Sequence, residues 1–244
     1  MRFDPPLMPC RFVRRYKRFF ADVRLPSGDL LTVHCANTGA MTACHAPDAP
    51  AWISDSQNPK RKLRHTLEIV EVDGARVAVN TQRPNHLVRE AIEAGRVPAL
   101  AGYDAVRPEV RYGDGHRGDL LLTRGDARCF VEVKNVTLGV GDGVSRFPDA
   151  VTTRGAAHLR ALADVARGGD RAVLFFCAGR DDTRVVEPAW AVDPAYGEAL
   201  LAALAAGVEV MAWRCRIEPT RGLWLAAEVP VQPRPERAPT RRPG

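Results

Sequence analysis

A short stretch at residues 130–136 carries an acid and a base in an order that suits chemistry at a phosphate. Apolar residues alternate there with Glu132 and Lys134, which is typical of a β-strand. Side chains along a strand point alternately to its two faces, so Glu132 and Lys134 lie on the same face. A carboxylate that binds a divalent cation, beside a lysine that steadies a phosphate or an attacking water, would be suited to phosphodiester hydrolysis.

A second acid, Asp119, lies thirteen residues before Glu132 in the sequence. Asp119 opens the apolar run 120–122, and residues 124–126 (Arg-Gly-Asp) form a turn between the two segments. If the segments pair as a hairpin, Asp119 and Glu132 meet across it. We therefore expect Asp119 and Glu132 to bind Mg²⁺ or Mn²⁺, and Lys134 to activate water or stabilise the transition state.

Helices and further strands must hold this hairpin in place. Asn85 is a suitable N-cap for a helix over 86–94, and Glu90 on that helix is a candidate third acid or base. On a second helix, Arg154 and His158 are four residues apart and share a face, so they could touch phosphate, with a capping or core role equally open. The predicted elements from residue 82 are a helix over 86–94, strands over 106–112, 119–123 and 129–136, a helix over 153–166, a strand over 172–177, a helix over 195–205, and strands over 208–217 and 223–229.

Residues 10–81 have a different pattern, of short strands separated by turns. Residues 11–25 and 30–35 are joined by Pro-Ser-Gly-Asp and predict one hairpin, and further strands are expected at 51–54, 67–72 and 75–80. Five strands in so short a segment predict a small barrel of the kind that binds oligonucleotides. An SH3-like barrel or a simple meander would give the same pattern.

Two basic clusters fall within this predicted barrel. The first cluster surrounds an aromatic residue and consists of Arg14, Arg15, Tyr16, Lys17 and Arg18. The second lies in a predicted loop and consists of Lys60, Arg61 and Lys62. Each cluster alone could be a solvated strand edge that discourages aggregation. Two clusters in one barrel, one of them with an aromatic ring that can stack on bases, favour nucleic acid.

Composition and charge narrow the class of protein and the compartment in which we expect it. The chain of 244 residues has a net charge of +6, and 12 Lys/Arg against 8 Asp/Glu fall in residues 1–81. The six cysteines form no C-x-x-C pair, which indicates a reducing compartment without a structural zinc site. No apolar run approaches the length of a membrane helix and the start lacks a signal-peptide core, so we expect a cytoplasmic protein that binds no membrane. The Pro/Arg-rich residues 232–244 predict a disordered tail.

Several ordered blocks of sequence also resemble a known family. They are Arg11-Phe12 with Arg15-Tyr16-Lys17-Arg18-Phe19, His34-Cys35-Ala36-Asn37-Thr38-Gly39-Ala40-Met41, Asn58-Pro59-Lys60-Arg61-Lys62-Leu63, Val79-Asn80-Thr81, Glu132-Val133-Lys134-Asn135-Val136-Thr137-Leu138, Phe147-Pro148-Asp149-Ala150-Val151-Thr152, Arg154-Gly155 and His158-Leu159. From Arg11 to Val231 the chain resembles the sugar fermentation stimulation protein family, SfsA.

This resemblance implies a fold and a function. The fold is an N-terminal OB-like β-barrel (1–81) followed by a mixed α/β domain (82–231) like the PD-(D/E)xK nucleases, whose core has the same α-β-β-β-α-β order. The function implied is DNA binding with little sequence preference and a regulatory link to maltose-type sugar metabolism. Where the family has Ser-Arg-x-Asp before the second strand, this chain has His116-Arg117-Gly118-Asp119, which keeps Arg117 as a DNA contact and Asp119 as the site acid.

Two hypotheses from different classes follow. The first is a DNA-binding protein whose nuclease-like domain is a scaffold, and the second is a nuclease that depends on a divalent metal. A lone Glu-x-Lys is more often an exposed ion pair, but the order of elements, Asp119 and Glu90 favour a functional site. We expect DNA binding first and nuclease activity as the alternative, while RNA binding and oligomeric state stay open.

Overall fold

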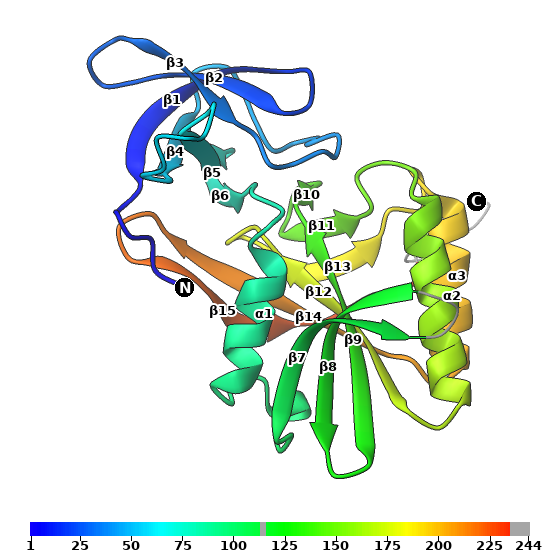
Figure 1. Ribbon diagram of the computed structural model, residues 1–244. Coiled ribbons are helices and arrows are strands. Elements are labelled where there is room, and N and C mark those ends of the chain that lie inside the picture. The colour runs from blue at the N-terminus through cyan, green and yellow to red at the C-terminus, as the bar shows by residue number, and fades with distance from the viewer. Residues whose placement is uncertain (113–115, 235–244) are drawn as a thin grey trace, which may run out of the picture.

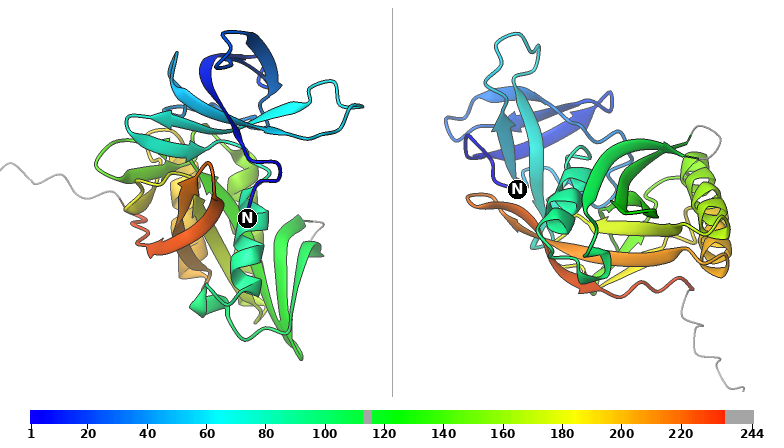
Figure 2. Two further views of the ribbon diagram at one scale, coloured as in Figure 1. Left: turned by 90° about the vertical axis from the view of Figure 1, so that its left-hand side faces the viewer. Right: turned by 60° about the horizontal axis from the view of Figure 1, so that its bottom comes forward.

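The computed structural model describes residues 1–112 and 116–234, and it consists of a β-barrel packed on one end of an α/β domain (Figures 1 and 2). Part of the predicted tail, 235–244, lies outside the described residues. The barrel segment contains β1 (Met8–Tyr16), β2 (Phe20–Arg24), β3 (Leu30–His34), β4 (Pro50–Asp55), β5 (His65–Val72) and β6 (Ala75–Ala78).

The first five strands close into a barrel. Their order is β3-β2-β1-β4-β5, and β3 also pairs with β5 through His34 and Thr66, so the sheet returns on itself. Strand β6 extends the sheet beyond β5. Alternate side chains such as Phe12, Val23 and Ile53 fill the interior and are at most 1% exposed. The predicted OB-like barrel is therefore confirmed.

One expectation about this barrel was wrong. Residues 11–25 predicted one strand, but the chain reverses within them, between β1 and β2. Lys17 and Arg18 adopt left-handed backbone angles, φ 48° and 61°, which glycine or asparagine usually supplies. The turn therefore carries no glycine or proline that would mark it in the sequence.

The α/β domain is built on a twisted sheet with helices on both faces (Figure 1). The order of this sheet is β15-β14-β12-β9-β8-β7, with β9, β12 and β14 parallel and the outer pairs antiparallel. A small second sheet, β10-β11-β13, lies between the main sheet and the barrel. The elements are α1 (Pro84–Glu93), the 3₁₀ helix η1 (Pro98–Leu100), β7 (Ala105–Tyr112), β8 (His116–Arg124), β9 (Ala127–Val136), β10 (Leu138–Gly139), β11 (Val144–Phe147), α2 (Thr153–Arg167), β12 (Arg171–Ala178), β13 (Val185–Pro188), α3 (Pro194–Ala205), β14 (Glu209–Glu218) and β15 (Gly222–Val229).

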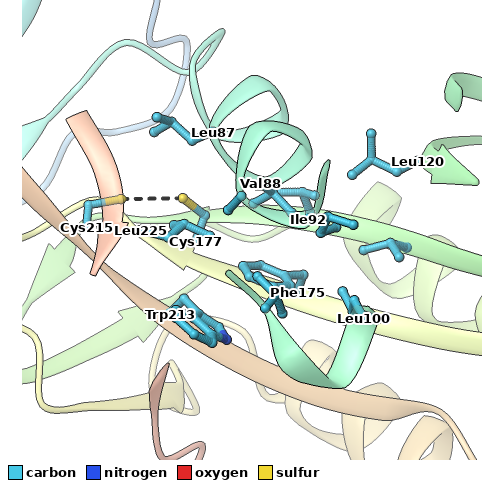
Figure 3. Close-up of a cluster of buried hydrophobic side chains, with 14 of the residues drawn as sticks. Leu87, Val88, Ile92, Leu100, Leu120, Phe175, Cys177, Trp213, Cys215 and Leu225 are labelled. Atoms are coloured by element: carbon cyan, nitrogen blue, oxygen red, sulfur yellow. Dashed lines mark hydrogen bonds between the residues drawn. The ribbon is translucent and has the colours of Figure 1, made fainter. Parts of the chain in front are cut away.

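Two hydrophobic cores lie on the two faces of the main sheet. Helix α1 packs Leu87, Val88 and Ile92 onto one face, against residues that include Phe175 and Trp213 (Figure 3). Helices α2 and α3 cover the other face. The N-cap of α1 is Arg83, with Pro84 in the first turn, and not Asn85 as predicted, because proline needs no backbone partner at that position.

Backbone hydrogen bonds join the barrel to the α/β domain. The amide of Ala78 in β6 donates to Gly179 O at 2.7 Å, and the Gly179 amide donates to Val136 O at 2.8 Å. A β-bridge also pairs Val77 with Arg180. Strand β6 is thus paired with the loop that follows β12, and backbone hydrogen bonds hold the barrel to the α/β domain.

A buried ion pair strengthens the same junction. Glu68 on β5 is 0% exposed and its carboxylate accepts hydrogen bonds from Arg83 Nη2 at 2.6 Å, Asn80 Nδ2 at 3.0 Å and Ser54 Oγ at 2.7 Å. Every oxygen of this buried acid therefore has a partner, as a charge removed from water requires.

Candidate active site

The β8–β9 hairpin brings the predicted acids and the lysine together. Leu120 pairs with Val131 and Arg124 with Ala127, around the turn predicted at 124–126. Gly125 has φ 55°, which suits a tight turn. The register places Asp119 beside Glu132, and the predicted hairpin is therefore present.

Glu132 is the most buried member of this group. Its side chain is 2% exposed, and Oε1 accepts hydrogen bonds from Lys134 Nζ at 2.6 Å and from His158 Nδ1. Oε2 is buried and has no hydrogen-bond partner in the described part of the chain. One oxygen of the carboxylate is thus fixed by two donors, while the other has unused hydrogen-bonding capacity.

His158 takes the second of the two roles that the sequence left open. It is 8% exposed and its ring lies against Glu132, so it has a core role and is not placed as a phosphate contact. Arg154 Nε donates to His158 Nε2 at 3.2 Å, so Nε2 accepts and Nδ1 carries the proton donated to Glu132. Arg154 and His158 do share a helix face, and together they hold Glu132.

Asp119 is anchored by two hydrogen bonds. Oδ2 accepts from the Val133 amide at 2.8 Å, and Oδ1 accepts from Asn85 Nδ2 at 2.6 Å. Burial, and then the charge of Glu132, raise the pKa of Asp119 above its usual value. Two carboxylates this close favour a bound cation, because a positive charge between them would offset their repulsion.

The pKa of Glu132 is shifted in the opposite direction to that of Asp119. Burial alone would raise the pKa of Glu132, but the hydrogen bond from His158 and the charge of Lys134 outweigh burial, so the pKa is lowered. Glu132 therefore stays ionised, as a metal ligand must.

The donor set fits a hard divalent cation. Among residues 1–112 and 116–234, no three His, Cys, Asp or Glu side chains are arranged to hold a metal ion. Mg²⁺ nevertheless needs only one or two carboxylates, because it retains several water ligands. The unpartnered Oε2 of Glu132 and the neighbouring Asp119 carboxylate supply that number.

Glu90 is not part of this group. Its carboxylate accepts a hydrogen bond from the Met1 amino group at 3.0 Å and lies 3.8 Å from Arg96 Nη2. The side chain lines a different pocket, near Trp224 at the far end of α1. The helix turns Glu90 towards β15, whereas Asn85, almost a turn and a half earlier, reaches the site.

Some side chains of the first basic cluster make hydrogen bonds and ion pairs within the barrel. Arg15 donates to the carbonyl oxygens of Asn37, Gly39 and Ala40, so it orders that loop and is not a free phosphate contact. Arg14 pairs with Asp22, and Tyr16 also donates to that carboxylate.

Other predicted cations remain at the surface. Lys17 and Arg18 are exposed in the β1–β2 turn, and Lys60, Arg61 and Lys62 are exposed in the β4–β5 loop. Arg117 is exposed and pairs with Glu109. Of the cations predicted to bind DNA in the barrel, those in this turn and this loop are the ones exposed without an ion pair in the described residues.

Two residues near the site gave no functional signal in the sequence. Asn85 looked like a helix cap, and Tyr196 lay within a helix of ordinary composition. The Tyr196 hydroxyl is buried without a hydrogen-bond partner in the described residues, and burial, then the charge of Glu132, raise its pKa. Only the packing of α3 against α2 shows that Tyr196 lies close to Glu132.

The fold and site define a class: an OB-barrel protein with a mixed α/β domain that carries two acids and a lysine on one hairpin. Family models match this chain as "SfsA N-terminal OB domain" over residues 13–79 and as "Sugar fermentation stimulation protein RE domain" over residues 82–221. The chain belongs to the sugar fermentation stimulation protein family, SfsA.

Known relatives agree with this assignment. A "Sugar fermentation stimulation protein homolog" of Geotalea uraniireducens is 52% identical over 232 residues, which cover 95% of this chain and 100% of that protein. The homolog of Teredinibacter turnerae is 55% identical over 219 residues, or 89% and 94% of the two chains. A solved structure, "The structure of Pyrococcus Furiosus SfsA in complex with Ca2+", is similar with a TM-score of 0.84 and 29% identity, covering 93% and 96%.

Proposed function

We propose that this protein binds DNA with little sequence preference and hydrolyses its phosphodiester bonds with the help of a divalent metal ion. The observation that carries the proposal is the state of Glu132. This carboxylate is almost fully buried and ionised, with one oxygen held by Lys134 and His158 and the other without a partner. A buried charge with an unused oxygen is costly unless a ligand binds it.

Each residue of the site has a defined part in such a reaction. Asp119 and Glu132 would hold the ion, which when bound would polarise the phosphate and lower the pKa of a water molecule. Lys134 lies on the same strand face as Glu132 and is only partly buried, so its ammonium can reach a phosphate oxygen or the attacking water. His158 keeps the Glu132 carboxylate in one orientation, which preserves the direction of Oε2.

The similar solved structure is consistent with an ion in this fold. Its printed description names Ca²⁺, a cation that prefers oxygen ligands. Asp119 and Glu132 offer such ligands here, and we propose Mg²⁺ or Mn²⁺ as the ion that supports reaction.

The barrel supplies the proposed binding surface. Five exposed cations lie on it, namely Lys17 and Arg18 in the β1–β2 turn and Lys60, Arg61 and Lys62 in the β4–β5 loop. Phosphate contacts of this kind carry no sequence information, so the proposed binding should have a low sequence preference, and it should weaken as salt rises because counterions are released.

The second candidate is a DNA-binding regulator that does not cut. The relatives' printed name, which refers to stimulation of sugar fermentation, favours it, and so does the ion pair by which Lys134 and Glu132 already neutralise each other. In that case the α/β domain would be a scaffold.

Cleavage assays separate the two candidates. Labelled single-stranded and duplex DNA, and RNA, would be incubated with the wild type, Glu132→Gln and Lys134→Ala, in Mg²⁺ or Mn²⁺ and in EDTA. Glu93→Gln and Arg167→Ala are controls, since both residues are exposed and lie outside the site and outside the cationic turn and loop of the barrel. We expect metal-dependent cutting that only the two site substitutions abolish while binding persists. Binding without cutting by the wild type would instead establish the regulator.

A further inference from the structure

A cleft lined by both polar and apolar groups lies where the barrel meets the α/β domain. Its inner pocket has a volume of about 180 Å³, and its outer pocket about 520 Å³. The two pockets share the lining residues Gly39, Phe147 and Asp149 and therefore adjoin, and together we call them the junction cleft.

Several polar side chains in the inner pocket have unused hydrogen-bonding capacity. Asn37 is 4% exposed; its Oδ1 accepts from the Gly39 amide at 2.8 Å, but its Nδ2 donates to no group in the described residues. The amide of Asn135 and the hydroxyl of Thr137, which is 6% exposed, also have no side-chain hydrogen bond there. These atoms are not sealed from solvent, so their convergence on one pocket leaves donors and acceptors that a ligand can use.

The walls of the cleft are held rigidly. Arg15 fixes the loop 37–40 through three carbonyl oxygens, and the Met41 amide donates to Asp149 Oδ2 at 3.0 Å. That last bond ties the barrel loop to the segment before α2. The pocket is therefore preformed, which lowers the entropic cost of binding.

The cleft and the candidate active site share two elements. Asn135 follows Lys134 on β9, with its side chain on the opposite face of the strand, and Thr152 at the outer pocket caps α2, the helix that carries His158. Phe147 in the shared wall also contacts Tyr196, with ring centroids 5.1 Å apart, and Tyr196 lies within the electrostatic reach of Glu132.

The chemistry of the lining selects one class of ligand. Amide and hydroxyl groups offer paired donors and acceptors that match the edge of a nucleobase. The inner pocket is smaller than the roughly 300–1,000 Å³ typical of sites for drug-sized ligands, which suits one flat ring and excludes a duplex. Arg18, exposed at the outer pocket, has no ion pair in the described residues and can meet a phosphate.

We propose that the junction cleft binds one unpaired nucleotide of a nucleic-acid strand, with its base in the inner pocket and its phosphate at the outer pocket near Arg18. This inference rests on the proposed function and names its substrate class: strands that are single or locally unpaired next to the cutting site. Stacking and edge contacts to one base would then favour single strands over blunt duplexes.

The test measures binding in EDTA, so that it does not depend on cleavage. Fluorescence anisotropy would compare a labelled single strand with a blunt duplex of the same length, for the wild type and Thr81→Phe. Thr81 is exposed at the rim of the inner pocket, and phenylalanine there would occupy the space of the base. Thr220→Phe is the matched control, because Thr220 is exposed in the β14–β15 turn, outside the cleft.

We expect the wild type to prefer the single strand, and Thr81→Phe to weaken that binding about tenfold with duplex binding unchanged. Thr220→Phe should match the wild type. Equal losses for both substrates, or no loss, would overturn the inference while leaving DNA binding intact. A wild type that binds neither substrate would refute the proposed function as well.

If circular dichroism shows that Thr81→Phe is unfolded, two further measurements still test the proposal. Asn135→Ala removes an edge contact without filling the pocket and should also weaken single-strand binding selectively. A 2-aminopurine base in the strand should brighten in the wild type as it leaves the stack, and should not in Asn135→Ala. Displacement of the strand by maltose, but not by a nucleoside monophosphate, would show a sugar site and overturn the inference.

Discussion

The hydrogen bond between His158 and Glu132 allows a matched pair of substitutions. Glu132 accepts from Nδ1, the ring nitrogen bonded to Cγ, while Nε2 accepts from Arg154. In His158→Asn the amide nitrogen occupies the place of Nδ1 and can still donate to Glu132. In His158→Gln it reaches the place of Nε2 instead, so the donor to Glu132 is lost.

The expected cost follows from burial and charge. A hydrogen bond to a charged group contributes about 1.5–3 kcal/mol, and His158 and Glu132 are 8% and 2% exposed, so water replaces it poorly. For a chain of this size each kcal/mol lowers the melting temperature by about 2–4 °C. We therefore expect His158→Gln to melt about 3–12 °C below His158→Asn.

Differential scanning calorimetry in EDTA would measure this difference. Arg154→Gln is the control for the outer contact, and since Arg154 is exposed its effect should be small. Equal melting temperatures for the Asn and Gln variants would refute the idea that Nδ1 holds Glu132. A more stable Gln variant would refute the tautomer as well.

Three further predictions follow from the described residues. Mg²⁺ at about a hundred times its Kd should stabilise the wild type by about 2.7 kcal/mol in thermal unfolding, and should not stabilise Asp119→Asn; an equal shift in both would remove Asp119 from the ligand set. Arg83→Met should cost about 3–5 kcal/mol in urea unfolding, because it leaves the Glu68 carboxylate buried without a charged partner, and a negligible cost would show that Asn80 and Ser54 suffice. Burial raises the pKa of Cys44 and of Cys129 to about 11, so the stability these neutral thiols contribute is complete below about pH 8.5 and should be lost as pH rises towards 11; a flat free energy of unfolding over that range would contradict this.

Patterns local in sequence predicted the hairpin of the site correctly. The alternation around Glu132 and the glycine turn at 124–126 lie within a few residues of each other, so sequence alone defined the strands and their register. The helices and strands of the α/β domain were likewise predicted close to their observed bounds, apart from the short strands β10, β11 and β13. Strand β13 pairs with β11 across some forty residues, which no local pattern reveals.

The errors have a common physical cause, which is that a side chain's partner is set by tertiary packing. Arg15 looked like a phosphate contact until its loop partners were known, and Glu90 looked like a site acid until α1 was oriented. His158 lies 26 residues from Glu132 in the chain, and only the docking of α2 on the sheet brings them together. The turn at Lys17 and Arg18 was missed because neither residue type favours the backbone angles they adopt.

The backbone bonds that join β6 to the loop after β12 have a mechanical consequence. With Ala78, Gly179 and Val136 in one hydrogen-bonded series, there is no free linker about which the barrel can swing. The span from the cations of the barrel to Glu132 is therefore constant, so the proposed cleavage would occur at a fixed number of nucleotides from the point at which the barrel holds the strand.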